Sequence, residues 1–445
     1  MNKFFTLLIS KICLRILKLI GKGSSLPGKI ALKLDKNIIK KIKIKSRVIA
    51  VTGSSGKGST SSMIVEVLRK SGYSVAHNMK GSNLKFGIVT LLVENSNLKG
   101  ELNKDYLVFE MDERYAKYVF CDIEPDFLIV TNVTRDQPPR QGNVDVVLQD
   151  IKLAIPAKTH IILNADSPYM QNLIIGLTNY VSYYSVAKNK YSLLESLYKK
   201  LNIYYCPKCN SKLNYSYYNF EENGKYKCIN EKCGFEIPEP LCEVTDIDYQ
   251  NNILTIDGTY NIKTECKLLF NVYNVLACFT ALKLLNIDLD KATKYLKEIY
   301  LSKKIYSHYT QNSRNVYVLN NKNENSTTFN QSLHFVNMNK EMKTIVVGWW
   351  QISRRYEFND ISWLYDIDFE ILNTHELETV ICVGPERYDI ATRVKLSGID
   401  KSKILTFENI KDACTFLKSN TSHDIYSILN FDYVAPFNKY MKGEK

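Results

Sequence analysis

One stretch near the amino terminus constrains the fold more than any other. Residues 48–52 are apolar and largely β-branched, residues 53–60 read Gly-Ser-Ser-Gly-Lys-Gly-Ser-Thr, and an apolar pattern with a period of 3.6 follows. A strand that leads through a glycine-rich turn into a helix is the context of a phosphate-binding loop. Glycines permit the turn, Lys57 and the helix N-terminus attract phosphate, and a hydroxyl can bind Mg²⁺. The stretch therefore predicts a nucleotide site, although a glycine-rich turn without a ligand is the alternative.

Length and charge set broad limits. A chain of 445 residues is too long for one ordinary core, so we expect two or three domains. The hydrophobic content of 45% and charged content of 24% are typical of a globular protein. The formal charge of +13 suits an anionic partner, which could be a phosphorylated substrate, an acidic membrane surface or a nucleic acid.

The first segment, residues 1–45, is basic and amphipathic. Within residues 3–20, Lys11, Arg15 and Lys18 form one stripe of a predicted helix, and apolar residues cover the rest. The interruption by Lys11 and the lack of a small-residue cleavage site argue against a spanning helix and a secretory signal. Such a helix either lies on an anionic membrane surface or packs against protein, and amphipathicity alone does not separate the two.

From residue 46 the sequence alternates between patterns typical of strands and patterns typical of helices. Short apolar runs, typical of strands in a mostly parallel sheet, occupy residues 106–109, 127–130 and 160–163. Ligands bind beyond the carboxyl ends of such strands. The polar residues expected at that edge are Glu110, Asp112, Asn132 and Asn164. Helix capping and turn formation are their alternative roles.

Four of the eleven cysteines have metal-binding spacing. Cys206 and Cys209 are separated by two residues, Cys228 and Cys233 by four, and eighteen residues lie between the pairs. Four thiolates at this spacing can close a tetrahedral structural Zn²⁺ site, with unmetallated thiols as the alternative. The surrounding lysines are mixed with glutamates, so we expect no nucleic-acid binding. The other cysteines are scattered, which favours a reducing cytoplasmic environment.

These patterns divide the chain into segments. Residues 46–302 form a predicted nucleotide-binding central domain, and residues 203–240 form a predicted zinc ribbon inserted in it. After Lys303 a second α/β domain, residues 303–445, is predicted from strand-like runs at 315–319, 343–347 and 378–383.

Several motifs occur together in a fixed order. They are Leu26-Pro27-Gly28, the loop at 53–60, Gly81-Ser82-Asn83, Glu110-Met111-Asp112-Glu113, Thr131-Asn132, Asn164-Ala165-Asp166, Asn271-Val272-Tyr273-Asn274, Asp360-Ile361-Ser362-Trp363 and Gly384-Pro385-Glu386-Arg387. In this set the chain resembles the MurT family, the Mur-ligase-related synthetase subunits of lipid II isoglutaminyl synthase, over nearly its whole length. The Gly-Lys-Gly-Ser motif of the loop resembles the loop of the folylpolyglutamate synthases, a sister family, more closely. The resemblance implies an α/β fold with a Mur-ligase-like P-loop central domain, an inserted zinc ribbon and a Rossmann-like C-terminal domain.

The resemblance also implies a reaction. In the family, ATP phosphorylates the α-carboxylate of D-Glu in the lipid II stem peptide, and ammonia from a GatD-type glutaminase subunit attacks the acyl phosphate. By similarity, Lys57 holds the β- and γ-phosphates, and Ser59 and Glu110 bind Mg²⁺. The remaining nucleotide-binding residues expected by similarity are Gly53, Gly56, Gly58, Thr60, Asn132, Asn271 and Asn274, with Asn83 near the acceptor.

One further residue is expected to serve the partner. In the family, an aspartate of the C-terminal domain completes the catalytic Cys/His pair of the glutaminase. Asp360 is the first candidate and Asp366 the second, because Ile361 and Trp363 would anchor the loop and leave the Asp360 carboxylate outward. A helix N-cap for residues 361–366 is the alternative role of Asp360.

The chain also departs from the family pattern. Pro138 and Pro139 replace family residues after Arg135-Asp136-Gln137, and Trp349-Trp350 replaces a polar element before Asp360. These changes identify a divergent member. We therefore expect a carbon–nitrogen ligase in the cytoplasm, with the cytoplasmic face of the membrane, where lipid II lies, as a further location. A ligase acting on another glutamyl carboxylate, and a nucleotide-binding scaffold without catalysis, are the alternatives.

Overall fold

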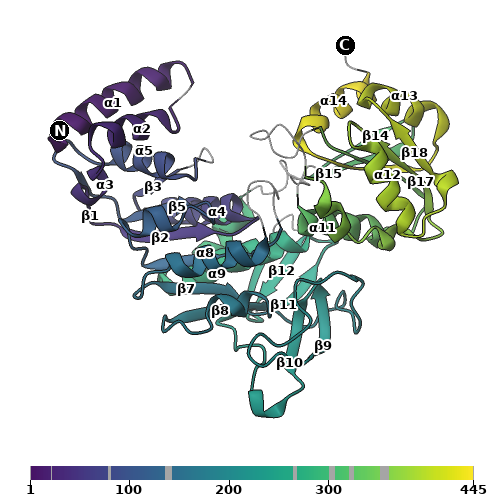
Figure 1. The fold of residues 1–445 in the computed structure, drawn as a ribbon, viewed down its shortest axis with the longest axis horizontal. Coiled ribbons are helices and arrows are strands. Elements are labelled where there is room, and N and C mark those ends of the chain that lie inside the picture. Colours follow the sequence, from purple (N-terminus) through teal and green to yellow (C-terminus); the bar gives the residue numbers. More distant parts are fainter. Residues whose placement is uncertain are drawn as a thin grey trace.

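A nine-stranded sheet organises the amino-terminal two thirds of the chain in the computed structural model (Figure 1). The structure describes residues 2–21, 23–78, 82–135, 143–263, 268–299, 306–319, 325–350 and 360–443. The spatial order of the strands is β13 (Tyr260–Lys263), β12 (Ile253–Ile256), β11 (Cys242–Asp248), β8 (Val181–Val186), β7 (His160–Asn164), β6 (Phe127–Val130), β2 (Arg47–Thr52), β5 (Tyr106–Glu110) and β3 (Val75–His77). Neighbours from β3 to β11 are parallel, and β12 and β13 are antiparallel. The predicted mostly parallel sheet is present.

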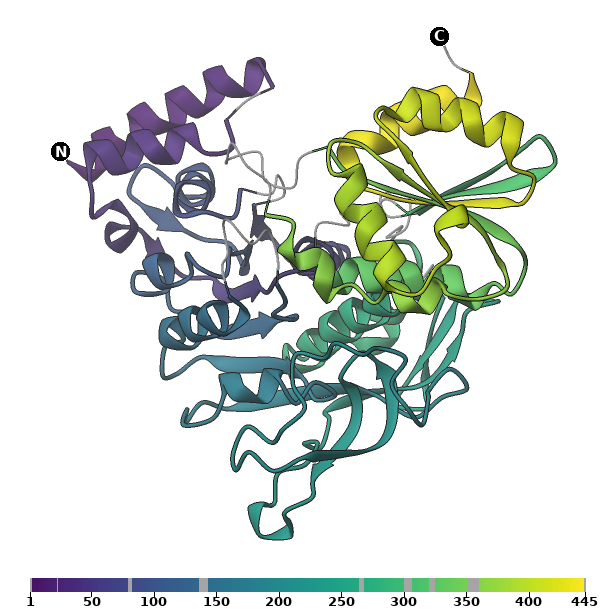
Figure 2. The same ribbon diagram turned by 45° about the vertical axis from the view of Figure 1, so that its right-hand side comes forward.

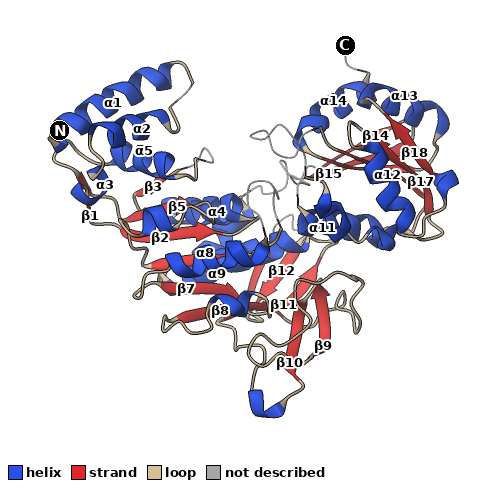
Figure 3. Ribbon diagram, viewed as in Figure 1, coloured by secondary structure: helices blue, strands red, loops and turns tan. Residues whose placement is uncertain are grey.

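Helices cover both faces of this sheet, which is why its strands are apolar on both sides (Figure 3). In β2, Ile49 and Val51 face one core, and Val48 and Ala50 face the other. The first core is closed by α4 (Lys57–Lys70), α9 (Leu269–Leu284) and α10 (Leu289–Lys297). The second is closed by α5 (Lys85–Asn95), α6 (Lys117–Phe120) and α8 (Val144–Ala154).

A helical layer formed by the first 41 residues packs on the second face. It consists of α1 (Lys3–Leu19), α2 (Leu26–Leu34) and α3 (Ile38–Lys41), and it leads into β1 (Lys43–Ile44), which pairs with β4 (Glu101–Leu102). Leu7 and Leu14 of α1 are buried against this layer and α5. Among the described residues, no helix is long and apolar enough to cross a membrane.

The C-terminal part is a second α/β unit with its own six-stranded sheet. The spatial order of its strands is β14 (Tyr306–Gln311), β15 (Arg314–Leu319), β19 (Asp424–Leu429), β16 (Lys343–Gly348), β17 (Leu377–Val383) and β18 (Ile404–Phe407). All are parallel except β14. One face is covered by α11 (Ser326–Met338) and α12 (Arg387–Leu396), and the other by α13 (Ile410–Asn420) and α14 (Phe431–Lys442). The predicted boundary between residues 302 and 303 lies outside the described residues.

The cysteine-rich segment is inserted between two neighbouring strands of the large sheet. β8 and β11 pair in parallel, and the chain between them forms the antiparallel hairpin of β9 (Leu213–Phe220) and β10 (Asn223–Cys228). This hairpin projects from the bottom of the molecule in Figure 1, while the N-terminal helices and the C-terminal unit rise on opposite sides in both views (Figure 2).

Candidate functional site

The glycine-rich loop between β2 and α4 has the geometry that glycine alone accommodates. Gly53 has φ +128°, and a β-carbon there would lie 2.3 Å from Thr131 Oγ1. Gly56 has φ +82°, and its β-carbon would lie 2.1 Å from Asn274 Oδ1. Both positions combine a left-handed backbone with a close neighbour. The loop is therefore fixed by its surroundings and ends at the N-terminus of a fourteen-residue helix.

Residues that follow β6 brace this loop from the adjacent strand. Asn132 Oδ1 accepts hydrogen bonds from Ser55 N at 3.0 Å and Ser55 Oγ at 3.2 Å, and its amide nitrogen donates to Ser55 O at 3.1 Å. Thr131 Oγ1 donates to the same carbonyl at 2.6 Å. Asn132 therefore lies at the loop, as predicted for a strand-end residue in a parallel sheet.

Lys57 is the cation of the loop. Its ammonium donates to Gly53 O and, at 3.4 Å, to Ser54 O, and it forms an ion pair with Glu113 Oε2 at 3.1 Å. The Glu113 side chain is only 1% exposed. These contacts hold the Lys57 ammonium at the loop, where a lysine can bind phosphate oxygens.

Glu110 ends β5 beside the first turn of α4. Its backbone N–H and C=O are both bonded to the Asn78 side chain at 2.9 Å, and Asn83 Nδ2 donates to its Oε1 at 2.9 Å. A β-carbon on Gly58 would lie 3.1 Å from Glu110 Oε2, so glycine leaves room for this carboxylate. The acid thus stands next to the turn that carries Ser59, where carboxylate and hydroxyl oxygens suit Mg²⁺.

Two asparagines of α9 carry buried polar atoms, and one of them, Asn274, lies against Gly56 of the loop. Asn271 and Asn274 are 2% and 3% exposed, and Asn271 Oδ1 and Asn274 Nδ2 have no hydrogen-bond partner within the described parts of the chain. The Thr60 hydroxyl is buried in the first turn of α4 and likewise has no hydrogen-bond partner among the described residues. Buried polar atoms without partners are costly. Asn274 lies against Gly56, and Thr60 N donates to Gly56 O, so the unpartnered atoms of these two residues lie where a ligand with hydrogen-bonding groups, such as a nucleotide, would fit.

Two other predicted strand-end residues take different positions. The Asn164 amide donates to Asn223 Oδ1 at 2.9 Å, and its Oδ1 accepts from Asp166 N at 3.0 Å, so this residue shapes its own turn and contacts the tip of the β9–β10 hairpin. Asp112 is 1% exposed, and its backbone N–H donates to Asn83 O at 3.0 Å. The turn-forming role describes Asn164 better than nucleotide contact does.

A cavity of about 480 Å³ lies between the central and C-terminal units. Its walls come from the loop after β6, the segment before β9, the tip of the β9–β10 hairpin and the C-terminal unit. They include Arg135, Lys200, Asn202, Glu221, Thr327, Asp360 and Asp366. The Arg135 guanidinium bridges the two units, because it pairs with Asp366 at 3.0 Å and donates to Ser362 Oγ.

Asp360 faces this cavity rather than the nucleotide loop. Its Oδ1 accepts from both the backbone N–H and the hydroxyl of Ser362, the first residue of the short 3₁₀ turn Ser362–Asp366, whose N-cap residue is Ile361. Burial opposes ionisation, yet these hydrogen bonds and Arg135 lower the pKa of Asp360. Trp363 is fully buried and anchors the turn, as predicted. The carboxylate thus holds Ser362 and is a charged group on the cavity wall.

The tip of the β9–β10 hairpin fastens the C-terminal unit. Glu221 is 5% exposed and accepts hydrogen bonds from Asn330 Nδ2 at 2.9 Å and Thr327 Oγ1 at 3.2 Å, both on α11. Asn330 Oδ1 in turn accepts from Asp368 N at 2.9 Å. Burial, followed by the neighbouring Glu222 carboxylate, raises the pKa of Glu221 to about 8. This buried contact joins the inserted segment to the C-terminal unit through α11.

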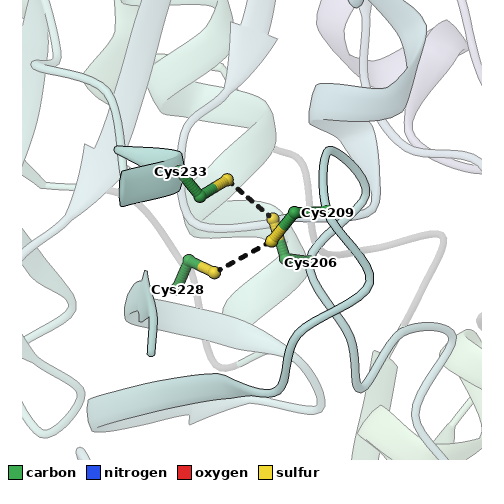
Figure 4. Close-up of side chains that lie close together, drawn as sticks. All are labelled: Cys206, Cys209, Cys228 and Cys233. Carbon is green, nitrogen blue, oxygen red and sulfur yellow. Dashed lines mark hydrogen bonds between the residues drawn. The ribbon is translucent and has the colours of Figure 1, made fainter. Parts of the chain in front are cut away.

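The four predicted metal-ligating cysteines meet at one point (Figure 4). Their Sγ atoms all lie within 4.8 Å of one another, with 3.6 Å between Cys206 and Cys233 and 3.5 Å between Cys209 and Cys228. A tetrahedral Zn²⁺ with Zn–S bonds of about 2.3 Å sets sulfurs about 3.8 Å apart. The four side chains therefore have the separation that such an ion needs.

Three residues with structural roles here were not among the predicted site residues. Glu113 pairs with Lys57, Asn78 holds Glu110, and Glu221 fastens the C-terminal unit. Asn78 directly follows β3, so the strand-end rule could have found it had this three-residue strand been recognised. No pattern in the sequence pairs Glu113 or Glu221 with its partner.

Two family descriptions match the chain. The Mur ligase middle domain matches residues 51–282, which hold the loop, Glu110 and the two asparagines of α9. The MurT ligase C-terminal domain matches residues 323–434, which hold Asp360 and Asp366.

The chain is also similar to individual proteins of known name and of known structure. The chain is 28% identical over 405 residues to the lipid II isoglutaminyl synthase (glutamine-hydrolyzing) subunit MurT of Staphylococcus aureus strain COL, covering 90% of this chain and 89% of that protein. It is 25% identical to the protein of that name in Streptococcus pneumoniae, covering 97% and 95%. Among solved structures, a pseudomurein peptide ligase type C from Methanothermus fervidus superimposes with a TM-score of 0.69 at 21% identity, covering 92% and 81%.

Proposed function

Since this chain belongs to the Mur ligase family, in its MurT branch, and is a ligase that forms carbon–nitrogen bonds, we propose that it amidates the stem peptide of lipid II. The acceptor in this proposal is the α-carboxylate of the D-Glu residue. It is activated by ATP as an acyl phosphate and then attacked by ammonia. Because lipid II is lipid-borne, the reaction takes place at the cytoplasmic face of the membrane.

The assembly around Gly56 is the observation that carries the proposal. The family implies ATP and Mg²⁺, and the residues here fit both groups. Lys57 and the N-terminus of α4 would hold the phosphates, while Asn271 and Asn274 supply unpartnered buried atoms for the adenosine. Ser59 and Glu110 would hold Mg²⁺, which supplies charge neutralisation during phosphoryl transfer.

The chemistry consists of two displacements. An oxygen of the acceptor carboxylate attacks the γ-phosphorus, and ADP leaves. Ammonia then attacks the acyl carbon, phosphate leaves with the C–O bond electrons, and the nitrogen loses a proton. Both steps depend on positioning and on charge stabilisation rather than on a covalent enzyme intermediate. The residues that position the reactants are those gathered at the loop.

Ammonia in this proposal comes from a glutaminase subunit of the GatD type. The MurT relatives are named as subunits of a glutamine-hydrolysing synthase, which supports a partner. Asp360 would complete the partner's Cys/His pair by orienting the histidine. The ion pair with Arg135 occupies Asp366, which favours Asp360 over Asp366 for this role.

The four-cysteine cluster is proposed to bind one structural Zn²⁺. The sulfur separations support this assignment, as do the four identical ligand types. The ion would stabilise a hairpin with a small core of Leu213, Tyr226 and Phe235. Through Glu221 at the hairpin tip, it would also steady the C-terminal unit.

A lysine variant tests the proposed reaction. Lys57→Met removes the charge and keeps most of the side-chain volume, so we expect ammonia-dependent amidation of lipid II to fall by about three orders of magnitude. Lys70→Met, at the other end of α4, is the matched control and should retain full activity. Amidation detected by mass spectrometry, together with ADP release, measures both. Full activity of Lys57→Met would contradict the site, and wild-type ligation of glutamate in place of ammonia would contradict the reaction.

A further inference from the structure

Helix α1 has a buried face and an exposed apolar face, and only the buried face is used by the fold. Thr6, Leu7, Ser10 and Leu14 are buried against the N-terminal layer and α5. The opposite side carries a run of exposed apolar side chains, referred to below as the outer face. Its members are Phe4, Phe5, Ile9, Ile12, Ile16, Leu19 and Ile20.

The outer face is extensive. Ile16, Ile20 and Leu19 are 58%, 62% and 87% exposed, and Phe5, Ile9, Ile12 and Ile16 recur at helical spacing. A helix that packs on a globular core needs one apolar stripe, and a second contiguous stripe marks an interaction surface. The fold therefore does not account for these side chains.

Positive charge is concentrated in the same layer. Residues 1–45 contain eleven lysines, one arginine and a single aspartate, a net charge of +11 in a chain whose total is +13. Arg15 is exposed beside Ile16 on α1, and Lys29 and Lys33 are exposed on α2. Lys11 and Lys18 donate to the Glu94 carbonyl and carboxylate on α5, and the Lys18 side chain is still 52% exposed.

We propose that the outer face of α1 docks on an anionic lipid bilayer. The apolar side chains enter the interface between headgroups and acyl chains, and the exposed cations of the N-terminal layer lie near the anionic headgroups. Because Leu7 and Leu14 are committed to the protein, α1 lies in the plane of the bilayer. A basic patch alone would suit any polyanion, and the broad apolar stripe is what selects lipid.

The position of α1 links this surface to the reactive centre. A recess of about 390 Å³ lies on the inner side of α1, lined by Leu14 and Lys18 on one side and by His77 and Asn78 on the other. Asn78 is bonded to the backbone of Glu110. Docking would thus bring the recess, and Glu110 behind it, close to a lipid-borne acceptor. This last point rests on the proposed function, and the docking surface itself does not.

Vesicle flotation tests the surface with the whole chain. We expect the wild type to float with vesicles of equal parts phosphatidylglycerol and phosphatidylcholine, less so in high salt and less with phosphatidylcholine alone. The double variant Ile9→Asp/Ile16→Asp should reduce the bound fraction by at least about tenfold. The matched control, Leu153→Asp/Leu396→Asp, places the same charges at positions 79% and 65% exposed on α8 and α12 and should bind like the wild type. Unchanged unfolding temperatures would establish that both variants fold.

Three results would overturn the proposal. The first is flotation of the Ile9→Asp/Ile16→Asp variant equal to that of the wild type, and the second is failure of the wild type to float with anionic vesicles. The third is a wild-type dimer that this variant converts to a monomer, because the outer face would then be a contact between two copies of the chain. Amidation of a lipid-free stem peptide separates this proposal from the proposed function. The double variant should amidate that peptide at the wild-type rate, and failure of the wild type to do so would contradict the proposed function and leave the flotation result intact.

Discussion

Replacement of Gly56 by alanine tests the geometry of the nucleotide loop. Gly56 has φ +82°, and the added β-carbon would lie 2.1 Å from Asn274 Oδ1, about 1 Å closer than the 3.0 Å limit of real contacts. Asn274 is 3% exposed in a packed interior, so it has little room to retreat. The methyl group therefore strains the loop and displaces an asparagine proposed to contact adenosine.

Two separate costs follow from this substitution. The left-handed backbone costs alanine roughly 1–2 kcal/mol of folding free energy relative to glycine. Displacement of Asn274 removes one hydrogen bond to the nucleotide, worth about 1.5 kcal/mol, which corresponds to a roughly tenfold increase in the Kd for ATP. The first cost affects stability, and the second affects ligand binding.

A second glycine separates these costs experimentally. Gly72 also has a left-handed backbone, with φ +91°, and a β-carbon there would meet no atom within 4 Å. Gly72→Ala should lose similar stability in thermal unfolding and keep the wild-type Kd for ATP in calorimetric titration. If Gly56→Ala and Gly72→Ala bind ATP equally well, Asn274 does not contact the nucleotide and the reasoning is refuted.

Three further predictions concern the rest of the molecule. Asp360→Asn should sharply reduce glutamine-dependent amidation and preserve ammonia-dependent amidation and ATP binding; equal loss with both nitrogen sources would assign Asp360 a structural role. Cys209→Ser should abolish binding of one Zn²⁺ per chain and expose residues 203–240 to protease, without changing ATP affinity, and zinc-free wild-type protein by metal analysis would contradict it. Burial favours the protonated Glu221 carboxyl in the folded state, so its contribution to stability is lost as pH rises from about 4.5 to about 8. Glu221→Gln does not titrate, so in thermal unfolding it should gain stability relative to wild type over that pH range. A stability difference that does not change with pH would contradict the burial argument.

Features that depend on neighbouring residues in the sequence could be predicted. The strand, loop and helix around residues 48–70 are contiguous, so their order and their glycines were sufficient to predict them. The cysteine spacing likewise predicted the meeting of the four sulfurs, since a short hairpin joins the two pairs. Local chemistry was enough in both cases.

Features that depend on strand order or domain placement could not be derived in this way. The ion pair of Lys57 with Glu113 forms because β5 lies next to β2. The apolar sequences of the two strands do not indicate that they are neighbours. The contact of Arg135 with Asp366 joins residues of two separate units. Asp360 lines a cavity shared by the two units, and sequence patterns do not specify which residues of the other unit lie across from it.

The N-terminal helix illustrates a limit of sequence patterns. The stripe of Lys11, Arg15 and Lys18 left two possibilities open, an anionic membrane surface or packing against protein. In the structure, Lys11 and Lys18 contact Glu94, and the apolar side chains divide into a buried face and an outer face. The exposure of each face depends on how α1 packs against α2 and α5, which helical periodicity does not specify.

Oxygen transfer from the acceptor tests the central claim most directly. The wild-type chain, supplied with ATP, Mg²⁺, ammonia and a lipid II whose D-Glu α-carboxylate carries heavy oxygen, should produce the amidated lipid. Each turnover should place one labelled oxygen in the released phosphate, because the carboxylate attacks the γ-phosphorus and the acyl C–O bond is then broken. ATP consumption that yields unlabelled phosphate and no amide, measured by mass spectrometry of both products, would contradict the account.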